Sequence, residues 1–538
     1  MKKKIISLLI LVIVIFSLNY LWLVPLNIRY LSSLVIFILI IVIIFMIINP
    51  KGLISYKYIE TFDLKGKKSF VKVPMITKNI GIGIFSFFII VIMYGLFSST
   101  MLFSKDYKNL IGAVEENVLD KNFLFDNIED LPIIDNGVAT ILGDKKIGED
   151  RGLGSEFRVG DFSDITYQNQ PYSVAPLEFN DFFKWLGNKS TPGYVLVNKK
   201  TGETTLVRDL NGKDIKMKYM PSAYFNNDLL RHTYFNGNMD NTLASYHFEI
   251  DDEGNPYWIL IKTHKTIGIS GGDDVLSAIT VNAVTGEVNE YNPSDAPSWI
   301  DIIYPSNLAL KQLDDWGYYV NGFFNTLFSE KEIIRITNGS RHVYHDGQMY
   351  HYTGLTSAGA DESTVGFAFV NTRTKETLFY TITGATEAAA MSSAEGKVQN
   401  LRYTSSFPIP VNIEEIPTFF MTLKDANGLI KQYAFVNIND YGKVGIGEDI
   451  QTARSNYLKL MNKDDVTSTL EEHSGIIKRI GYSNNNYYLL LENNEQLFYS
   501  DVEEINKILS LSKIGDNIKI NTLNDSIKQV ENITLGVK

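Results

Sequence analysis

The chain has 538 residues, of which 45% are hydrophobic and 12% aromatic, so it can form several globular cores. It contains no cysteine, which excludes disulfide bonds, thiol catalysis and cysteine-ligated metal sites. Residues 1–103 carry 11 basic and 2 acidic residues (net +9), which leaves 39 basic and 59 acidic residues (net −20) for the remainder. A body this acidic disfavours nucleic acids and anionic cell-wall polymers as partners.

Three apolar runs open the chain: Ile5–Val24, Tyr30–Ile48 and Ile80–Phe103. Each approaches the roughly 20 residues that cross a bilayer core, so we predict a three-helix membrane anchor over residues 1–103. The first run is too long for a signal-peptide core and has no Ala-x-Ala site, which favours a retained span. No ionisable residue interrupts the runs, so they predict an anchor rather than an ion path.

The basic residues predict the orientation of this anchor. Three lysines precede the first run, and seven lie between residues 50 and 79, whereas the connection between the first two runs has only Arg29. Because basic loops remain in the cytoplasm, the N-terminus is expected to be cytoplasmic and residues 104–538 extracytoplasmic.

Residues 104–131 are predicted to form a juxtamembrane helix and linker, because Leu110, Ile111, Val114 and Val118 recur at helical spacing. Four related units are then expected at 132–210, 211–300, 301–384 and 385–471, the last ending in a helix. Each consists of a helix followed by an antiparallel three-stranded meander that ends in a strand with an Asn/Thr/Gly turn. The copies of this signature are Val197–Glu203, Val281–Glu287, Val370–Glu376 and the degraded Val436–Gly442.

The elements within the units follow from periodicity and turn residues. Helices are expected at 137–142, 179–186, 223–235, 313–327, 386–399 and 450–461. Strands are expected at 157–159, 173–177, 193–198, 245–250, 257–262, 333–336, 348–354, 366–371, 418–423 and 432–437. Residues 472–538 have five short strand patterns with a helical insertion at 502–511, which predicts a small β-barrel resembling an OB fold. This segment lacks the basic, aromatic groove of single-strand-binding barrels.

The hairpin pattern Phe248–Trp258 and the signature Ile279–Val288 resemble the PepSY domain, whose meander usually ends in Asp-x-x-Thr-Gly-Glu-Val. This chain has Asn in place of that Asp, and its His264–Leu276 loop is longer than usual. The resemblance implies an α+β fold of tandem PepSY-like units. PepSY domains occur in peptidase propeptides and in membrane-anchored bacterial envelope proteins, where they are thought to restrain or localise partners. They carry no catalytic residues, and the implied location is the bacterial cell membrane.

Three of the seven histidines, His342, His345 and His351, lie in one short segment that could offer ligands to a divalent metal. If residues 342–345 form a strand and Asp346-Gly347 a hairpin turn, His342 and His345 point to opposite faces, and His351 lies across the turn. The Gly-rich Ile267–Asp274 lacks the Lys-Ser/Thr of a phosphate loop, and Asp251–Asn255 lacks calcium-loop spacing. We therefore assign no catalytic, cofactor-binding or metal-binding residue and expect no cofactor.

The sequence thus predicts a membrane-anchored extracytoplasmic protein that acts as a non-catalytic interaction or regulatory scaffold in the bacterial envelope. Its expected partner is another envelope or membrane protein, for which a basic surface would be favoured, or a second copy of the chain; nucleic acid is not expected. Two alternatives stand beside this: a metal-dependent hydrolase that uses the His342–His351 segment, and a subunit of a secretion- or conjugation-type membrane assembly.

Overall fold

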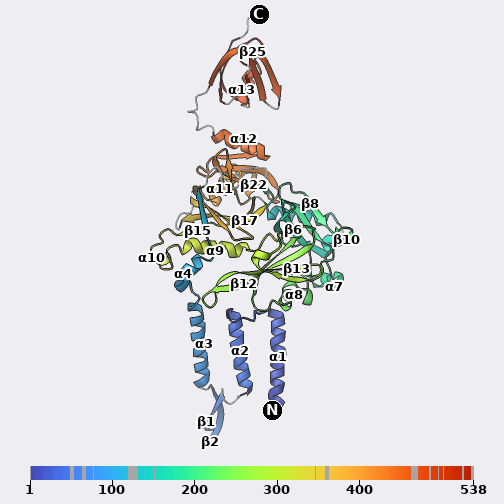
Figure 1. Ribbon diagram of the computed structural model, residues 1–538, viewed down its shortest axis with the longest axis vertical. Coiled ribbons are helices and arrows are strands. Elements are labelled where there is room, and N and C mark those ends of the chain that lie inside the picture. Colours follow the sequence, from blue (N-terminus) through green and yellow to red (C-terminus); the bar gives the residue numbers. More distant parts are fainter. Residues whose placement is uncertain are drawn as a thin grey trace. The chain divides into compact units, whose positions relative to one another are not determined.

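The computed structural model describes residues 2–48, 54–62, 68–76, 78–118, 131–150, 152–345, 347–357, 363–461, 471–483, 486–492, 494, 496–500, 502–523 and 526–534. The chain divides into two compact units, Met1–Arg454 and Ser455–Lys538. Both contain helices and strands, so the predicted α+β class is confirmed (Figure 1).

The N-terminal apolar runs form three helices, α1 (Lys2–Trp22), α2 (Leu31–Ile48) and α3 (Lys78–Leu96). Among the described residues, two stretches are long and apolar enough to cross a membrane, Ile5–Trp22 and Phe85–Lys108. The described apolar part of α2 ends at Ile44 and is shorter. The prediction of three spans is therefore corrected to two candidate spans and one shorter apolar helix. Strands β1 (Ile54–Phe62) and β2 (Lys68–Ile76) form a hairpin between α2 and α3.

Four separate sheets follow in the first unit, and each is built mainly of antiparallel neighbours. Sheet one has β4 (Phe157–Val159), β5 (Ser163–Tyr167), β6 (Gln170–Phe179), β7 (Tyr194–Asn198) and β8 (Thr204–Val207). Sheet two has β11 (Thr242–Ile250), β12 (Pro256–Ile267), β13 (Gly271–Asn282) and β14 (Val288–Tyr291). Between them, β9 (Asp209–Leu210) and β10 (Lys213–Asp214) form a short hairpin.

Sheet three has β15 (Ile334–Ile336), β16 (Arg341–His345), β17 (Gln348–Ser357), β18 (Ser363–Asn371) and β19 (Thr377–Ala385). Sheet four has β20 (Thr404–Ser405), β21 (Ile409–Ile413), β22 (Ile416–Lys424), β23 (Ile430–Asn437) and β24 (Val444–Gly447). In all four sheets one order recurs: a leading strand, a long strand, the signature strand and a closing strand.

The Asn of the signature explains why the turn after each signature strand is so similar. Its side-chain oxygen accepts from the backbone N–H groups two and three residues later, as Asn282 does from Val284 (3.0 Å) and Thr285 (2.9 Å). Asn198 and Asn371 make the same pair of bonds, and Asn437 accepts from Asp440. Such an Asx turn needs a short side chain with an acceptor, which Asn supplies after each signature strand.

The helices pack on these sheets and confirm most of the predicted helical segments. They are α4 (Thr100–Lys108), α5 (Asn136–Gly148), α6 (Leu153–Glu156), α7 (Phe182–Asn188), α8 (Leu229–Phe235), α9 (Ser306–Tyr318), α10 (Asn325–Phe328), α11 (Glu387–Lys397) and α12 (Ile450–Met461). The predicted helix at 313–327 is two helices, α9 and α10, separated by a bend at Gly322, whose φ is +81°. The predicted helix at 223–235 is likewise a 3-10 turn, η3 (Phe225–Asn227), followed by α8.

Two predictions about local structure are wrong. Val114–Val118, expected as part of a helix, forms β3, which pairs in parallel with the edge strand β19. The 264–276 segment, expected as a long loop, is mostly strand, because β12 and β13 extend to a tight turn at Gly268–Ser270. In both places backbone pairing with a neighbouring strand outweighs the local pattern.

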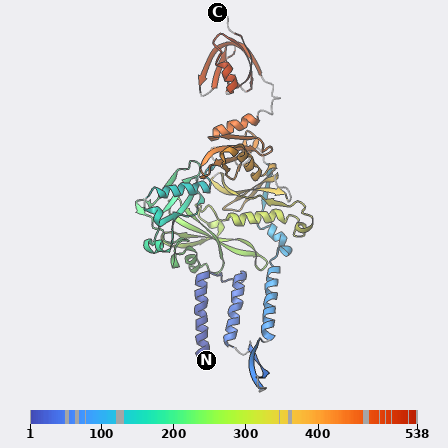
Figure 2. The same ribbon diagram turned by 180° about the vertical axis from the view of Figure 1, so that it is seen from behind.

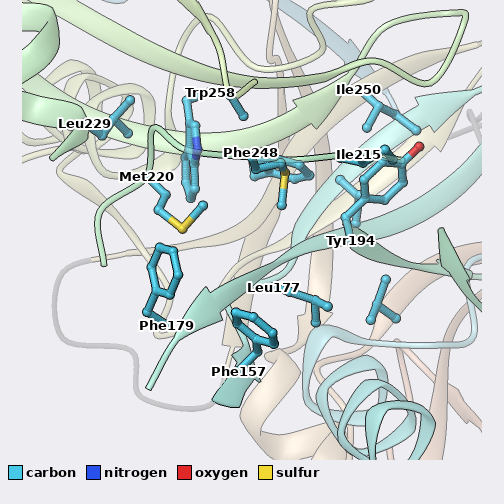
Figure 3. Close-up of a cluster of buried hydrophobic side chains, with 14 of the residues drawn as sticks. Phe157, Leu177, Phe179, Tyr194, Ile215, Met220, Leu229, Phe248, Ile250 and Trp258 are labelled. Carbon is cyan, nitrogen blue, oxygen red and sulfur yellow. The ribbon is translucent and has the colours of Figure 1, made fainter. Parts of the chain in front are cut away.

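Sheets one and two share a single hydrophobic core (Figure 3). Phe157, Leu177 and Phe179 of the first region meet Phe248 and Trp258 of the second, and the rings of Phe248 and Trp258 lie 5.3 Å apart in an edge-to-face arrangement. Neither sheet could bury its apolar face alone, so the first two predicted units form one packed body.

The connections next to the apolar helices are joined to α8 and to sheet two by specific hydrogen bonds. The Tyr234 hydroxyl donates to the Val24 carbonyl (2.6 Å), and the Tyr30 hydroxyl donates to the Thr263 carbonyl (2.7 Å). At the end of α3, Ser98 Oγ accepts from the backbone N–H of Ser270 (2.8 Å). The apolar helices and the sheets of the first unit are therefore in direct contact, and Figures 1 and 2 draw this unit from two sides.

The second unit is a closed barrel with the strand order β25-β26-β27-β29-β28. Its strands are β25 (Glu471–Ser483), β26 (Asn486–Leu491), β27 (Leu497–Ser500), β28 (Asn517–Leu523) and β29 (Ser526–Thr534), with α13 (Glu503–Leu509) inserted after β27. The barrel interior is apolar, with Ile477, Leu489 and Phe498 fully buried. The predicted small barrel with one helical insertion is confirmed.

Candidate functional site

The histidine segment forms the β16–β17 hairpin, as its sequence indicates. In the strand register, His342 lies opposite His351, and His345 lies opposite Gln348. His342 Nε2 is 3.0 Å from His351 Nδ1, so these two rings are hydrogen-bonded across the strands. His345 is on the opposite face of β16 from His342, as strand alternation requires. Asp346 of the predicted turn lies outside the described residues.

Two residues that the sequence did not single out complete a buried chain of polar groups. Asp164 of β5 places Oδ2 at 2.9 Å from His342 Nδ1, and its Oδ1 accepts from Lys199 Nζ at 2.5 Å. Asp164 is 4% exposed and Lys199 1%. Lys199 lies in the first signature turn, next to Asn198, and its side chain is directed inward. The chain Lys199–Asp164–His342–His351 thus links sheet one to sheet three.

The hydrogen-bond partners determine where the protons are. His351 Nε2 lies 2.7 Å from the Tyr304 carbonyl, which can only accept, so this nitrogen carries a proton. Burial, with the charge of His342, lowers the pKa of His351 to about 3, so its ring is neutral and Nδ1 accepts from His342 Nε2. Burial alone would raise the pKa of Asp164, but Lys199 and His342 together hold it far below its ordinary value. Asp164 and His351 therefore occupy both ring nitrogens of His342.

A pocket of about 250 Å³ opens beside this chain at the junction of sheets one, three and four. Its walls are Asp135, Asn136, Asp164, Lys199, Ser306, Ser340, Arg341, His342 and Phe407. Arg341 donates to the carbonyls of Phe407 (3.1 Å) and Pro132, and Asp135 is paired with Lys424 at 2.7 Å. The lining thus sets the basic side chains of Lys199 and Arg341 against the carboxylates of Asp135 and Asp164.

The pocket holds serine, histidine and aspartate, the residue types of a serine hydrolase, but not in a working arrangement. A catalytic histidine must keep one nitrogen free to take the serine proton while the other is oriented by a carboxylate. Here Asp164 orients His342 Nδ1, but His342 Nε2 is already hydrogen-bonded to His351 Nδ1. Neither Ser306 nor Ser340 makes a hydrogen bond to His342 among the contacts of the described residues. In this arrangement His342 is therefore not available as a general base.

The metal hypothesis finds no ligand set within the part of the chain that the structure describes. No group of three or more His, Asp or Glu side chains there could hold a metal ion. Both nitrogens of His342 are already hydrogen-bonded, and His345 is on the other face of its strand. The alternative of a metal-dependent hydrolase at His342–His351 consequently has no ligand set among these residues.

A second buried acidic pair lies where sheet two meets the segment leading to α9. Glu249 is fully buried and accepts from the backbone N–H groups of Asp301 (2.9 Å) and Ile302 (3.1 Å) and from His247 Nε2 (2.8 Å). Burial and the neighbouring Glu249 charge raise the pKa of Asp301 well above its ordinary value. This pair therefore joins sheet two to the segment that leads to α9.

The two loop motifs of the sequence have structural roles. Asp251 Oδ1 accepts from the N–H groups of Glu253 (3.1 Å) and Asn255 (2.7 Å), which closes the predicted hairpin turn. The Gly-rich segment forms the β12–β13 tip, where the Ile269 N–H donates to the Phe97 carbonyl at 3.3 Å.

Comparison with known proteins adds no family. No protein-family profile and no curated protein matches the chain. A putative glycoside hydrolase from Parabacteroides distasonis ATCC 8503 aligns at 8% identity over 71% of this chain and 94% of its own, with a TM-score of 0.17. A Trypanosoma rangeli sialidase in complex with sialic acid aligns at 7% identity over 69% of this chain and 53% of its own, with a TM-score of 0.13. Similarities this weak carry no argument about fold or function.

Proposed function

We propose that this protein is a membrane-anchored, extracytoplasmic, non-catalytic interaction scaffold of the bacterial envelope. The observation that carries the proposal is the buried chain Lys199–Asp164–His342–His351. Each of its groups is used in joining sheet one to sheet three, so His342 lacks the free ring nitrogen that a general base needs. Groups used in this way stabilise a shape rather than a reaction.

The repeated sheets support the resemblance to PepSY domains, from which the scaffold role is inferred. The recurring strand order and the Asx turns after the signature strands are what tandem units of one ancestral type would have. The direct bonds between the apolar helices and sheet two would hold the body close to other membrane proteins. Confinement of this kind raises the effective concentration of a partner without any new contact.

The acidic body favours a basic protein surface as the partner. The signature turns bring one acidic residue each to the surface, because Glu203, Glu287 and Glu376 occupy the same exposed turn position in sheets one, two and three. A basic partner would be drawn to these sites by electrostatic steering, which salt weakens.

The test is capture by the full-length protein from detergent-solubilised membranes at low and at high salt, with cross-linking carried out after the salt is set. We expect one envelope protein to be captured, less at high salt, and less still by a chain with Glu203→Lys, Glu287→Lys and Glu376→Lys. The matched control reverses the exposed Lys145 and Lys213 to Glu and should leave capture undiminished. Capture that is indifferent to both salt and the Glu→Lys changes would refute the proposal. A hydrolytic activity that His342→Ala abolishes would show instead that the protein is an enzyme.

A further inference from the structure

Four apolar side chains form an exposed group on α7 and the η3 turn, which we call the α7 patch. Phe183 is 77% exposed, Phe225 59%, Leu186 48% and Tyr224 38%. The patch is supported from below by packed rings, since Phe182 packs edge-to-face on Tyr224 with ring centres 4.9 Å apart. Lys189 Nζ lies 4.4 Å above the neighbouring Trp185 ring. The exposed rings are therefore held outward by packed ones.

The α7 patch is bonded directly to the end of the first candidate span. The Tyr20 hydroxyl donates to Asn226 Oδ1 (3.0 Å), next to Phe225. Arg231 donates from Nε to the Tyr20 carbonyl (3.1 Å) and from Nη1 to the Phe225 carbonyl (2.9 Å). Since α1 ends at Trp22, these bonds place the patch at the level where the span leaves the bilayer.

A second exposed group, which we call the α10 patch, lies beside the other candidate span. Phe328 is 81% exposed, Phe324 58% and Leu327 57%, and the rings of Phe324 and Phe328 are stacked at 6.4 Å. The segment before α10 packs on α4, where Lys108 Nζ donates to the Val320 carbonyl (3.2 Å). Helix α4 follows α3 after three residues, and its Met101 and Leu102 are 49% and 51% exposed.

Together the patches place exposed apolar surface beside the body-side end of both candidate spans. In Figures 1 and 2 the α7 region lies beside α8 near α1, and α10 lies beside α4 near α3, on opposite sides of the body. Aromatic side chains with nearby lysines are the residues that favour the interface between lipid and water. On a surface that faces water, exposed apolar groups like these would favour aggregation.

We infer that the α7 and α10 patches seat the extracytoplasmic body on the lipid surface, with their aromatic rings in the interface of the bilayer. A lipid surface is the one partner that reaches both patches at once, because it is continuous between the two spans. This inference rests on the membrane anchoring of the proposed function. It adds that the body lies against the bilayer rather than standing free of it.

The absence of cysteine allows a direct test by nitroxide labelling at single cysteines. The full-length chain is reconstituted into vesicles of phosphatidylethanolamine and phosphatidylglycerol. Labels are placed at Phe183→Cys and Phe328→Cys, whose exposed side chains can be replaced without disturbing a core. Controls are Val12→Cys in α1 and Asn427→Cys in the exposed β22–β23 turn. Collision with oxygen, which enters lipid, is compared with collision with a water-soluble nickel chelate.

We expect the oxygen-to-nickel collision ratio to be highest at position 12, intermediate at 183 and 328, and lowest at 427. Ratios at 183 and 328 equal to that at 427 would show both patches in water and overturn the inference. Low collision with both reagents at 183 and 328 would show a protein cover and also overturn it. A low ratio at position 12 would instead refute the membrane anchoring itself, so the two failures are distinguishable.

Discussion

Replacing Asp164 by Asn should strongly destabilise the body, because Asp164 is the acceptor on which the buried chain depends. Its carboxylate accepts from Lys199 (2.5 Å), Ser173 (2.9 Å) and His342 (2.9 Å). The Asn side chain keeps one acceptor and turns a donor toward other donors. The Lys199 side chain, 2% exposed, is then a buried charge without a counter-charge. Breaking one partner of such a pair costs about 3–5 kcal/mol of unfolding free energy.

The assay is urea unfolding of the full-length chain in detergent, followed by tryptophan fluorescence. Adding Lys199→Met removes the orphaned charge, so the double variant should recover at least about 2 kcal/mol relative to the sum of the single changes. The matched control is Asp150→Asn, which removes an ion pair to Arg208 of similar length (3.0 Å) but with side chains 40% and 51% exposed. Exposed pairs contribute about 0–1 kcal/mol. A cost for Asp164→Asn no greater than that of the control, or strict additivity with Lys199→Met, would refute the reasoning.

Three further predictions test other parts of the molecule. The pKa of His351 is about 3 in the folded chain and about 6.5 in the unfolded chain, so between these pH values the unfolded chain binds more protons. The free energy of unfolding therefore falls as the pH is lowered. Between pH 6.5 and pH 5 the loss of unfolding free energy due to His351 should be about 2 kcal/mol. In the His351→Gln variant, urea unfolding at the same two pH values should show a loss of unfolding free energy that is smaller by this amount. A loss equal to that of the unchanged chain would contradict the assignment. Gly268→Ala should cost about 1–3 kcal/mol, since φ is +55° and the new Cβ would meet a carbonyl just beyond α3; Gly212→Ala, in open space at φ +75°, should cost less in the same measurement. Single cysteines at Ser55 and Ser340 should test orientation: an impermeant maleimide should label position 340 in intact cells and spare position 55, and the reverse would place the body in the cytoplasm.

The sequence predicted well those elements whose identity is set locally. Helix α12 has the predicted bounds, Ile450–Met461, because its apolar periodicity is strong, and β4 has the predicted bounds, Phe157–Val159. The signature turns were recognisable because an Asn side chain bonds to backbone groups only two and three residues away. Strand β3 was missed, since Val114 and Val118 match helical spacing and the strand's partner β19 is far away in the sequence.

The candidate site shows the same division. The pairing of His342 with His351 followed from a hairpin turn, which is a local feature. Asp164 and Lys199 could not be found, because their meeting with His342 depends on how sheet one packs against sheet three. Lys199 gave no sequence signal, because a lysine among the polar residues of a turn is ordinarily exposed, and only the packing of the sheets buries it.

The parallel pairing of β3 with β19 constrains the order of assembly during synthesis. Val114 pairs with Thr377, 263 positions later (377−114), so the strand that follows the anchor is made long before its partner leaves the ribosome. Sheet three cannot be completed by local hairpins alone, because β3 stays unpaired until β19 has been synthesised. The Lys375 ammonium closes the same junction by donating to the Leu110 carbonyl at 2.9 Å. A nascent chain arrested before residue 377 would therefore display β3 as an unpaired strand just after the apolar helices.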